Sequence, residues 1–153
     1  MNPERIKLVE PPYISSITSH FNKRISRGSW RISKNLRKSF YYAIQGITYC
    51  FLSQRNFRIQ IVLGAVALSL GLWLELNLEK LAIIVFTIAS VLILELINTA
   101  IESVVDLAIG RRFHPLARIA KDCAAGAALI AAFCSLIVGL ILLLPALLTQ
   151  LGA

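Results

Sequence analysis

The hydrophobic pattern of the chain predicts three long helices that cross a membrane. Apolar residues dominate three stretches, at about 59–76, 81–109 and 116–148. Each is long enough to span the hydrocarbon core of a bilayer as an α-helix. Short polar segments separate them, and no alternating pattern typical of β-strands is present. We therefore expect an all-α membrane protein.

A different pattern precedes the first span. Between about residues 30 and 52, apolar side chains such as Leu36 and Ile44 recur at helical spacing, and basic side chains fall largely on other faces. This pattern is typical of an amphipathic helix that lies on the membrane surface. Residues 1–29 have no long apolar face, and we expect a mobile basic N-terminal tail there. Residues 30–153 would then form one membrane domain.

The second span carries a stripe of polar residues. They recur at three- and four-residue steps: Glu95, Asn98, Glu102 and Asp106. At about 100° per residue, the four lie within about 80° of one another on one helix face. Acids at membrane depth are costly and mark a functional site by default. The alternative, that this is only the cytoplasmic end of a long helix, explains the acids but not the apolar residues on every other side.

Carboxylates and an amide in this arrangement favour one kind of chemistry. Carboxylates are ligands that hard cations such as Mg²⁺ prefer, and Mg²⁺ commonly combines one or two of them with substrate phosphates. A second carboxylate nearby can accept a proton. The stripe therefore predicts a divalent-cation and proton-transfer site. The cysteines Cys50, Cys123 and Cys134 lack a metal-binding spacing, and we interpret them as small apolar residues.

Composition and charge add an orientation. Hydrophobic residues make up 57% of the 153 residues, and the net charge is +8. Of the 16 Lys and Arg residues, eleven precede residue 59 and four lie within 110–121, whereas 75–80 holds one. By the positive-inside rule, the N-terminus and the 110–121 segment are cytoplasmic and the C-terminus is outside. We expect the basic segments to meet anionic lipid, and we expect no nucleic-acid partner.

The polar stripe, together with Ala120-Lys121-Asp122 and the small residues that follow it, resembles the prokaryotic diacylglycerol kinase family, which includes undecaprenol kinases. The resemblance covers about residues 37–148. It implies a homotrimeric bundle with active sites at subunit boundaries, in a bacterial-type cytoplasmic membrane. It also implies an ATP- and Mg²⁺-dependent lipid kinase that phosphorylates the hydroxyl of diacylglycerol to give phosphatidic acid, with undecaprenol as the alternative acceptor.

Residue roles follow from position and from this resemblance. Glu95, the deepest acid, suits the proton acceptor, and Asn98 would orient the lipid hydroxyl and Glu95. Glu102 matches the family's Mg²⁺ ligand. Lys121 is a natural partner for phosphate charge. The expected nucleotide-binding residues are Tyr42, Glu102, Asp106, Arg112, His114, Lys121 and Asp122, and the expected substrate-binding residues are Glu95, Asn56 and Arg58.

The partners of three charged residues stay open on the sequence. Asp122 would fix Lys121 or accept a hydrogen bond from the nucleotide, and Asp106 would hold the site or pair with Arg111 or Arg112. We also expect a single chain to expose Glu95 and Asn98 to lipid, a cost that association would remove.

Gln54 departs from the family pattern. Three residues before Phe57, the family carries a Glu that helps to hold the divalent cation, and this chain has Gln54. An amide oxygen is an uncharged and weaker ligand. If Gln54 is the second metal ligand, cation binding leans more on Glu102, on ATP and on water, and an inactive family member is one alternative.

A protein of another class would also use the stripe. A non-enzymatic oligomeric membrane protein or pore would place Glu95, Asn98 and Glu102 in the core of its oligomer. Lys121 separates the two hypotheses, because a phosphate site uses a lysine and the mouth of a cation pore does not. The choice between diacylglycerol and undecaprenol stays open, because both offer a primary hydroxyl at the interface.

Overall fold

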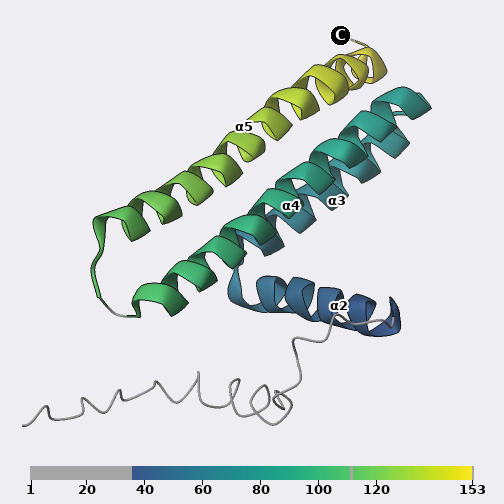
Figure 1. The fold of residues 1–153 in the computed structure, drawn as a ribbon. Coiled ribbons are helices and arrows are strands. Elements are labelled where there is room, and N and C mark those ends of the chain that lie inside the picture. The colour runs from purple at the N-terminus through teal and green to yellow at the C-terminus, as the bar shows by residue number, and fades with distance from the viewer. Residues whose placement is uncertain (1–35, 111, 153) are drawn as a thin grey trace, which may run out of the picture. The chain divides into compact units, whose positions relative to one another are not determined.

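Every regular element in the described part of the chain is an α-helix. The computed structural model describes residues 36–110 and 112–152. Its helices, in chain order, are α2 (Leu36–Ser53), α3 (Arg55–Trp73), α4 (Leu78–Ile109) and α5 (Pro115–Leu151) (Figure 1). The helices α3, α4 and α5 are long and apolar enough to cross a membrane. The predicted all-α fold with three spanning helices is therefore confirmed.

The first part of the chain differs in its boundaries from the expectation. The predicted tail, 1–29, and the first six residues of the predicted surface helix, 30–35, lie outside the described residues. Only Gln54 separates α2 from α3, with extended dihedral angles (φ −101°, ψ 116°). The polar residues after it form the first turn of α3 rather than a separate break. As a result α3 begins at Arg55, before the expected start at Ile59.

The ends of α4 and α5 have local chemical causes. The Asn77 side chain accepts a hydrogen bond from the backbone N–H of Lys80 (3.1 Å), which caps α4. The helix ends at Gly110, whose φ of 60° suits a residue without a Cβ. His114 caps α5 in the same way as Asn77 caps α4, and Pro115 occupies the first turn, where a missing N–H costs nothing.

The central helix of the spanning region is α4, which packs against both α3 and α5. Two glycines of α3 allow a close approach. A Cβ added at Gly64 would lie 2.8 Å from Ile88 Cγ2, and one at Gly71 would lie 3.2 Å from Leu81 Cδ2. Small residues let helix backbones pack closely in a membrane. These contacts hold α3 in a fixed position along α4.

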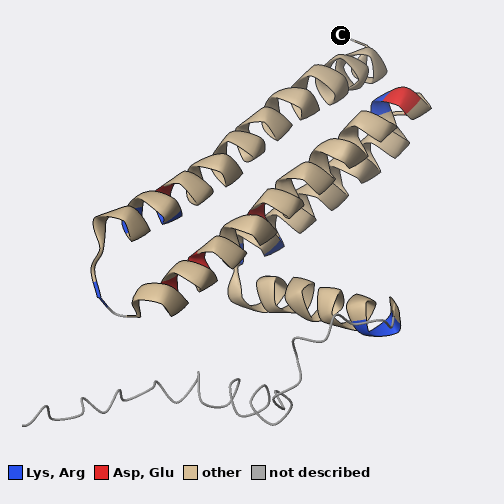
Figure 2. Ribbon diagram, viewed as in Figure 1, with Lys and Arg blue, Asp and Glu red and all other residues tan. Residues whose placement is uncertain are grey.

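Most charged residues of the spanning helices lie near their ends, but the acids of α4 extend to Glu95, midway along this helix (Figure 2). The sequence contains no Lys, Arg, Asp or Glu in 59–74, in 81–94 or in 123–153. Many apolar side chains on these helices are exposed in the chain, as expected for a surface that faces lipid. The polar stripe of α4 therefore begins at Glu95, directly after the uncharged stretch 81–94.

Candidate functional site

The polar stripe of α4 runs from a buried end to an exposed end. Glu95 is 4% exposed and Asn98 is 8% exposed, whereas Glu102 is half-buried and Asp106 is exposed. At a rise of about 1.5 Å per residue, Glu95 and Asp106 lie about 16 Å apart along the helix axis. The structure corrects one expectation here, because the chain itself buries Glu95 and Asn98. Their burial does not depend on a second copy.

Asn98 joins the two halves of the stripe. Its Nδ2 donates a hydrogen bond to Glu102 Oε1 (3.3 Å). Its Oδ1 is buried and has no hydrogen-bond partner among the described residues. A buried polar atom without a partner is costly, and such atoms in native structures call for an explanation. An acceptor oxygen is therefore available beside an oriented carboxylate.

A lysine from α5 reaches the exposed end of the stripe. Lys121 Nζ lies 2.6 Å from Asp106 Oδ1. Asp122 instead faces Arg118, with 3.5 Å between its Oδ2 and the arginine Nε. The alternative in which Asp122 fixes Lys121 is therefore wrong. Of the two arginines expected as partners of Asp106, Arg112 makes no ion pair with it, and Arg111 lies outside the described residues. Residues adjacent in a helix point in different directions, whereas residues four apart share a face.

Two residues that the sequence analysis left out of the site lie at its buried end. Thr99 is buried, and its Oγ1 donates to the backbone carbonyl of Glu95 (2.9 Å). Cys50 of α2 is 1% exposed, and its Sγ lies 3.4 Å from Thr99 Oγ1. Burial raises the pKa of the Cys50 thiol, and the nearby Glu95 adds to this effect. Thr99 lies at about 40° on the helical wheel, so the stripe pattern already pointed to it.

The segment around the start of α3 contributes mainly local contacts. Gln54 is the N-cap residue of α3, is half-buried, and makes no side-chain cap hydrogen bond. Arg58 is exposed and donates from Nη1 to the backbone carbonyls of Phe51 (3.2 Å) and Leu52 (3.1 Å). Asn56 is exposed. Arg58 thus holds the C-terminal end of α2 against the first turn of α3.

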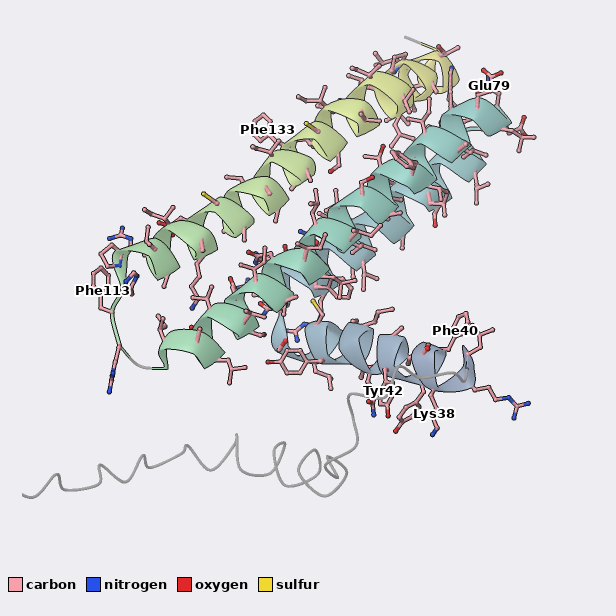
Figure 3. All side chains as sticks on the ribbon, in the orientation of Figure 1. Lys38, Phe40, Tyr42, Glu79, Phe113 and Phe133 are labelled. Atoms are coloured by element: carbon pink, nitrogen blue, oxygen red, sulfur yellow. The ribbon has the colours of Figure 1, made fainter. Side chains whose placement is uncertain are left out.

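The expected nucleotide residues outside α4 and α5 lie on exposed surfaces. Tyr42 is an exposed residue of α2. Arg112 and His114 are exposed in the segment between α4 and α5, and His114 Nδ1 accepts from the backbone N–H of Leu116 (3.3 Å). Figure 3 shows Phe113 in the same segment, at the opposite end of the spanning helices from Glu79. A hollow of about 460 Å³ is lined there by Arg112, Phe113 and His114, together with the end of α4.

A larger apolar groove lies between the spanning helices. Its volume is about 550 Å³, and α3, α4 and α5 all line it. One of its lining residues, Val91, precedes Glu95 by one helical turn. Gln60 also lines the groove, and its Oε1 is a buried oxygen without a hydrogen-bond partner in the described residues. The groove therefore ends close to the buried part of the polar stripe.

The donor set for a metal ion is small. Within residues 36–110 and 112–152, no group of three or more His, Cys, Asp or Glu side chains is arranged to hold a metal ion. Glu102 is the half-buried carboxylate of the stripe, and Asn98 orients it. A cation bound here would take most of its ligands from elsewhere. Mg²⁺ that is bound together with phosphates meets this condition, because it needs one or two protein carboxylates.

The fold and the polar stripe together define a class of membrane protein. The chain is a helical membrane protein with three spanning helices, and it has a buried carboxylate at one end of a polar stripe and a lysine at the other. The model of the family described as "Prokaryotic diacylglycerol kinase" matches residues 41–143. The chain belongs to this family.

Relatives with two different names are similar to the chain. The diacylglycerol kinase of Synechocystis sp. is 48% identical over 127 residues, which cover 83% of this chain and 73% of the relative. The undecaprenol kinase of Bacillus subtilis is 43% identical over 108 residues, or 71% and 87% of the two chains. The diacylglycerol kinase of Escherichia coli is 32% identical over 106 residues, or 69% and 86%.

Proposed function

We propose that this member of the family is an ATP- and Mg²⁺-dependent lipid kinase that phosphorylates the hydroxyl of diacylglycerol and yields phosphatidic acid. The observation that carries the proposal is the order of groups along α4. A buried carboxylate, Glu95, lies one helical turn beyond Val91, which lines the apolar groove, and a lysine, Lys121, lies at the exposed end. A lipid alcohol and a nucleotide approach a membrane site from these two directions.

The buried end supplies the groups that act on the hydroxyl. Phosphoryl transfer needs positioning, neutralisation of phosphate charge and a base for the attacking hydroxyl. We assign the base to Glu95 and the orientation of the hydroxyl to Asn98. One Nδ2 proton of Asn98 is used on Glu102, and the other can be donated to the lipid oxygen while the hydroxyl proton faces Glu95. As the bond from the lipid oxygen to the γ-phosphorus forms and the bond to the β-phosphate oxygen breaks, the hydroxyl proton passes to Glu95.

The middle of the stripe fits Mg²⁺. Glu102 is a half-buried carboxylate whose orientation Asn98 fixes through a 3.3 Å hydrogen bond. When bound, Mg²⁺ supplies neutralisation of phosphate charge. Glu102 would hold it with the ATP phosphates and water, and Gln54 would be a weaker, uncharged ligand.

The exposed end would bind the nucleotide. We propose that Lys121 contacts phosphate oxygens of ATP, with Asp106 as the group that positions it. Tyr42, Arg112, His114 and Asp122 are proposed nucleotide contacts, and the hollow lined by Arg112 and His114 supports this assignment for the loop. Asn56 and Arg58 are proposed contacts of the lipid substrate.

The proposed assembly is a homotrimer in a bacterial-type cytoplasmic membrane. The basic segments at the N-terminus and at 110–121 support an orientation with the N-terminus cytoplasmic and the C-terminus outside. Glu102, Asp106 and Lys121 then lie at the cytoplasmic face, where ATP is present.

Undecaprenol is the second candidate acceptor. The observation that favours it is the 43% identity with a relative named undecaprenol kinase, across 87% of that relative. Because the 48% identical relative is named diacylglycerol kinase, the experiment must compare both lipids directly.

The test is phosphorylation of the two lipids in parallel by the purified protein in mixed micelles, with ATP and Mg²⁺. We expect transfer of phosphate to one of them, and a loss of activity of about 100-fold or more in Glu95→Gln, because an amide cannot accept the proton. Equal activity of Glu95→Gln and the parental protein would contradict the role of Glu95. No turnover of either lipid at high Mg²⁺ would contradict the proposed function and favour a non-enzymatic oligomer or a lesion at Gln54.

A further inference from the structure

A chain of hydrogen bonds connects the surface helix α2 to the backbone of Glu95. Cys50 Sγ lies 3.4 Å from Thr99 Oγ1, and Thr99 Oγ1 lies 2.9 Å from the backbone oxygen of Glu95. All three residues are buried. Cys50 lies on α2, whereas Thr99 and Glu95 lie one turn apart on α4. The contact therefore joins two separate helices at the turn that carries the proposed base.

The direction of these hydrogen bonds follows from proton counting. A threonine hydroxyl has one proton and two lone pairs. The backbone oxygen of Glu95 is only an acceptor, so the Thr99 proton is used there. Thr99 Oγ1 then accepts from the Cys50 thiol. Burial raises the pKa of this thiol, which keeps it protonated and able to donate.

A hydroxyl that bonds back to a carbonyl one turn earlier alters the local helix. The carbonyl is then shared between the backbone N–H and the side chain, and such sharing often bends a helix. At Thr99 the affected carbonyl belongs to Glu95. The rotamer of Thr99 is in turn held by a thiol on α2. The position of the C-terminal end of α2 and the placement of Glu95 are thus linked through one hydroxyl group.

We propose that Thr99 is a positioning residue, which couples the contact between the C-terminal end of α2 and α4 to the placement of Glu95 for proton transfer. This proposal rests on the function proposed above for Glu95. Thr99 does not contact the reacting atoms. It acts through the Glu95 backbone and through the Cys50 contact.

The chain contains a matched control for Thr99. Thr87 also lies on α4, and its Oγ1 donates to the backbone oxygen of Ile83 (2.7 Å) in the same way. Within the described residues, the Thr87 hydroxyl has no hydrogen bond to another helix. Thr87→Val therefore removes the same hydroxyl and the same backbone bond without breaking a contact to α2. A difference between the two variants isolates the cross-helix link.

The first readout is lipid phosphorylation with kcat and KM measured separately. We expect Thr99→Val to lower kcat by about 3- to 10-fold, the range of one neutral hydrogen bond. The KM for ATP should change by less than about 2-fold, because Lys121 and Asp106 lie further along the stripe. Thr99→Ser keeps the hydroxyl and should restore kcat. Thr87 lines the apolar groove, so Thr87→Val can change the KM for the lipid, but it should keep the parental kcat. Equal losses in the two valine variants would overturn the proposal, since they would reflect helix packing alone.

The second readout does not need kinase activity. In a background with Cys123→Ala and Cys134→Ala, which removes the two exposed thiols, Cys50 is the remaining cysteine. Its alkylation by N-ethylmaleimide in the folded protein reports how often the C-terminal end of α2 leaves α4. We expect Thr99→Val to speed this reaction by about 3-fold or more, and Thr99→Ser and Thr87→Val to leave it at the parental rate.

The two readouts separate the coupling from the function on which it rests. An unchanged Cys50 alkylation rate in Thr99→Val overturns the coupling, whatever the kinase assay shows. Faster alkylation with an unchanged kcat overturns the positioning role and leaves only a structural contact. A parental protein without kinase activity overturns the proposed function itself, and with it the role of Thr99 in proton transfer.

Discussion

Lys121 pairs with a carboxylate fifteen residues away rather than with its neighbour in sequence. Its side chain is 36% exposed and that of Asp106 is 59% exposed, so water screens the pair. Exposed ion pairs contribute only about 0–1 kcal/mol to stability. The pair therefore matters less for holding α4 to α5 than for where it places a positive charge, at the end of a stripe that already contains three acidic residues.

Lys121→Met tests this interpretation at the residue scale. We expect the KM for ATP to rise by about 10-fold or more, because the proposed phosphate partner is lost. We also expect the melting temperature in detergent to change by only a few degrees, because the ion pair is exposed. Asp106→Asn, which keeps the lysine, should likewise leave the melting temperature nearly unchanged. A large loss of stability with an unchanged KM would make the pair a structural clamp instead.

Side-chain partners were harder to predict than side-chain positions. The spacing of Glu95, Asn98 and Glu102 places them on one face from the helix period alone, and the structure agrees. The partner of Lys121 depends on how α5 packs against α4. The residue spacing within a single helix carries no information on that packing. The helix period also places Thr99 beside the stripe, but the period does not reveal its contact with Cys50. Each is an ordinary small residue in its own helix, and their contact exists only between helices.

At the scale of elements, the ends of the helices were more predictable than the contacts between them. Gly110 and Pro115 mark helix ends through backbone chemistry that any glycine or proline shares, and they lie next to the expected end at 109 and the expected start at 116. The start of α3 was not predicted, because polar residues in a first helical turn look like a loop. Arg58 explains why the helix starts early. It lies in the first turn of α3, and its guanidinium donates hydrogen bonds to carbonyls at the C-terminal end of α2.

The packing of α3 on α4 predicts a position that is sensitive to one methyl group. In Gly64→Ala the new Cβ would lie 2.8 Å from Ile88 Cγ2. This methyl carbon is bonded directly to the branched Cβ of Ile88, so it stays close to the α4 backbone. The helices must then separate, and we expect a loss of about 1–3 kcal/mol in the free energy of unfolding. The measurement is denaturant-induced unfolding in micelles.

Gly126→Ala is the control for this substitution. Gly126 also lies in a spanning helix, but a Cβ at this position meets no atom of the chain within 4 Å. We expect no loss of stability, and a small gain from the higher helix propensity of alanine. Equal destabilisation by the two substitutions would show that close packing at Gly64 is not the cause.

At the scale of the whole molecule, each chain already buries the polar end of its own site. Glu95 and Asn98 are covered without a neighbour, so shielding from lipid does not by itself require a trimer. The length of the stripe is a different argument. Lys121 pairs with Asp106, which lies about 16 Å along α4 from Glu95. A γ-phosphoryl group is too small to contact Lys121 and a hydroxyl beside Glu95 at the same time over this distance. A lysine from a second copy would close this gap.

Mixing two inactive variants tests whether neighbouring chains complete a site. At an ATP concentration well below the raised KM of Lys121→Met, both this variant and Glu95→Gln are expected to be strongly impaired alone. If Glu95 of one chain works with Lys121 of the next, random trimers formed from equal amounts of both should recover about a quarter of the parental activity. Co-purified chains with two different tags ensure that hybrids are measured, and the molar mass in detergent checks for three copies. Trimers without recovered activity would mean that each chain holds a complete site, with Lys121 moving from Asp106 toward Glu102 when ATP binds.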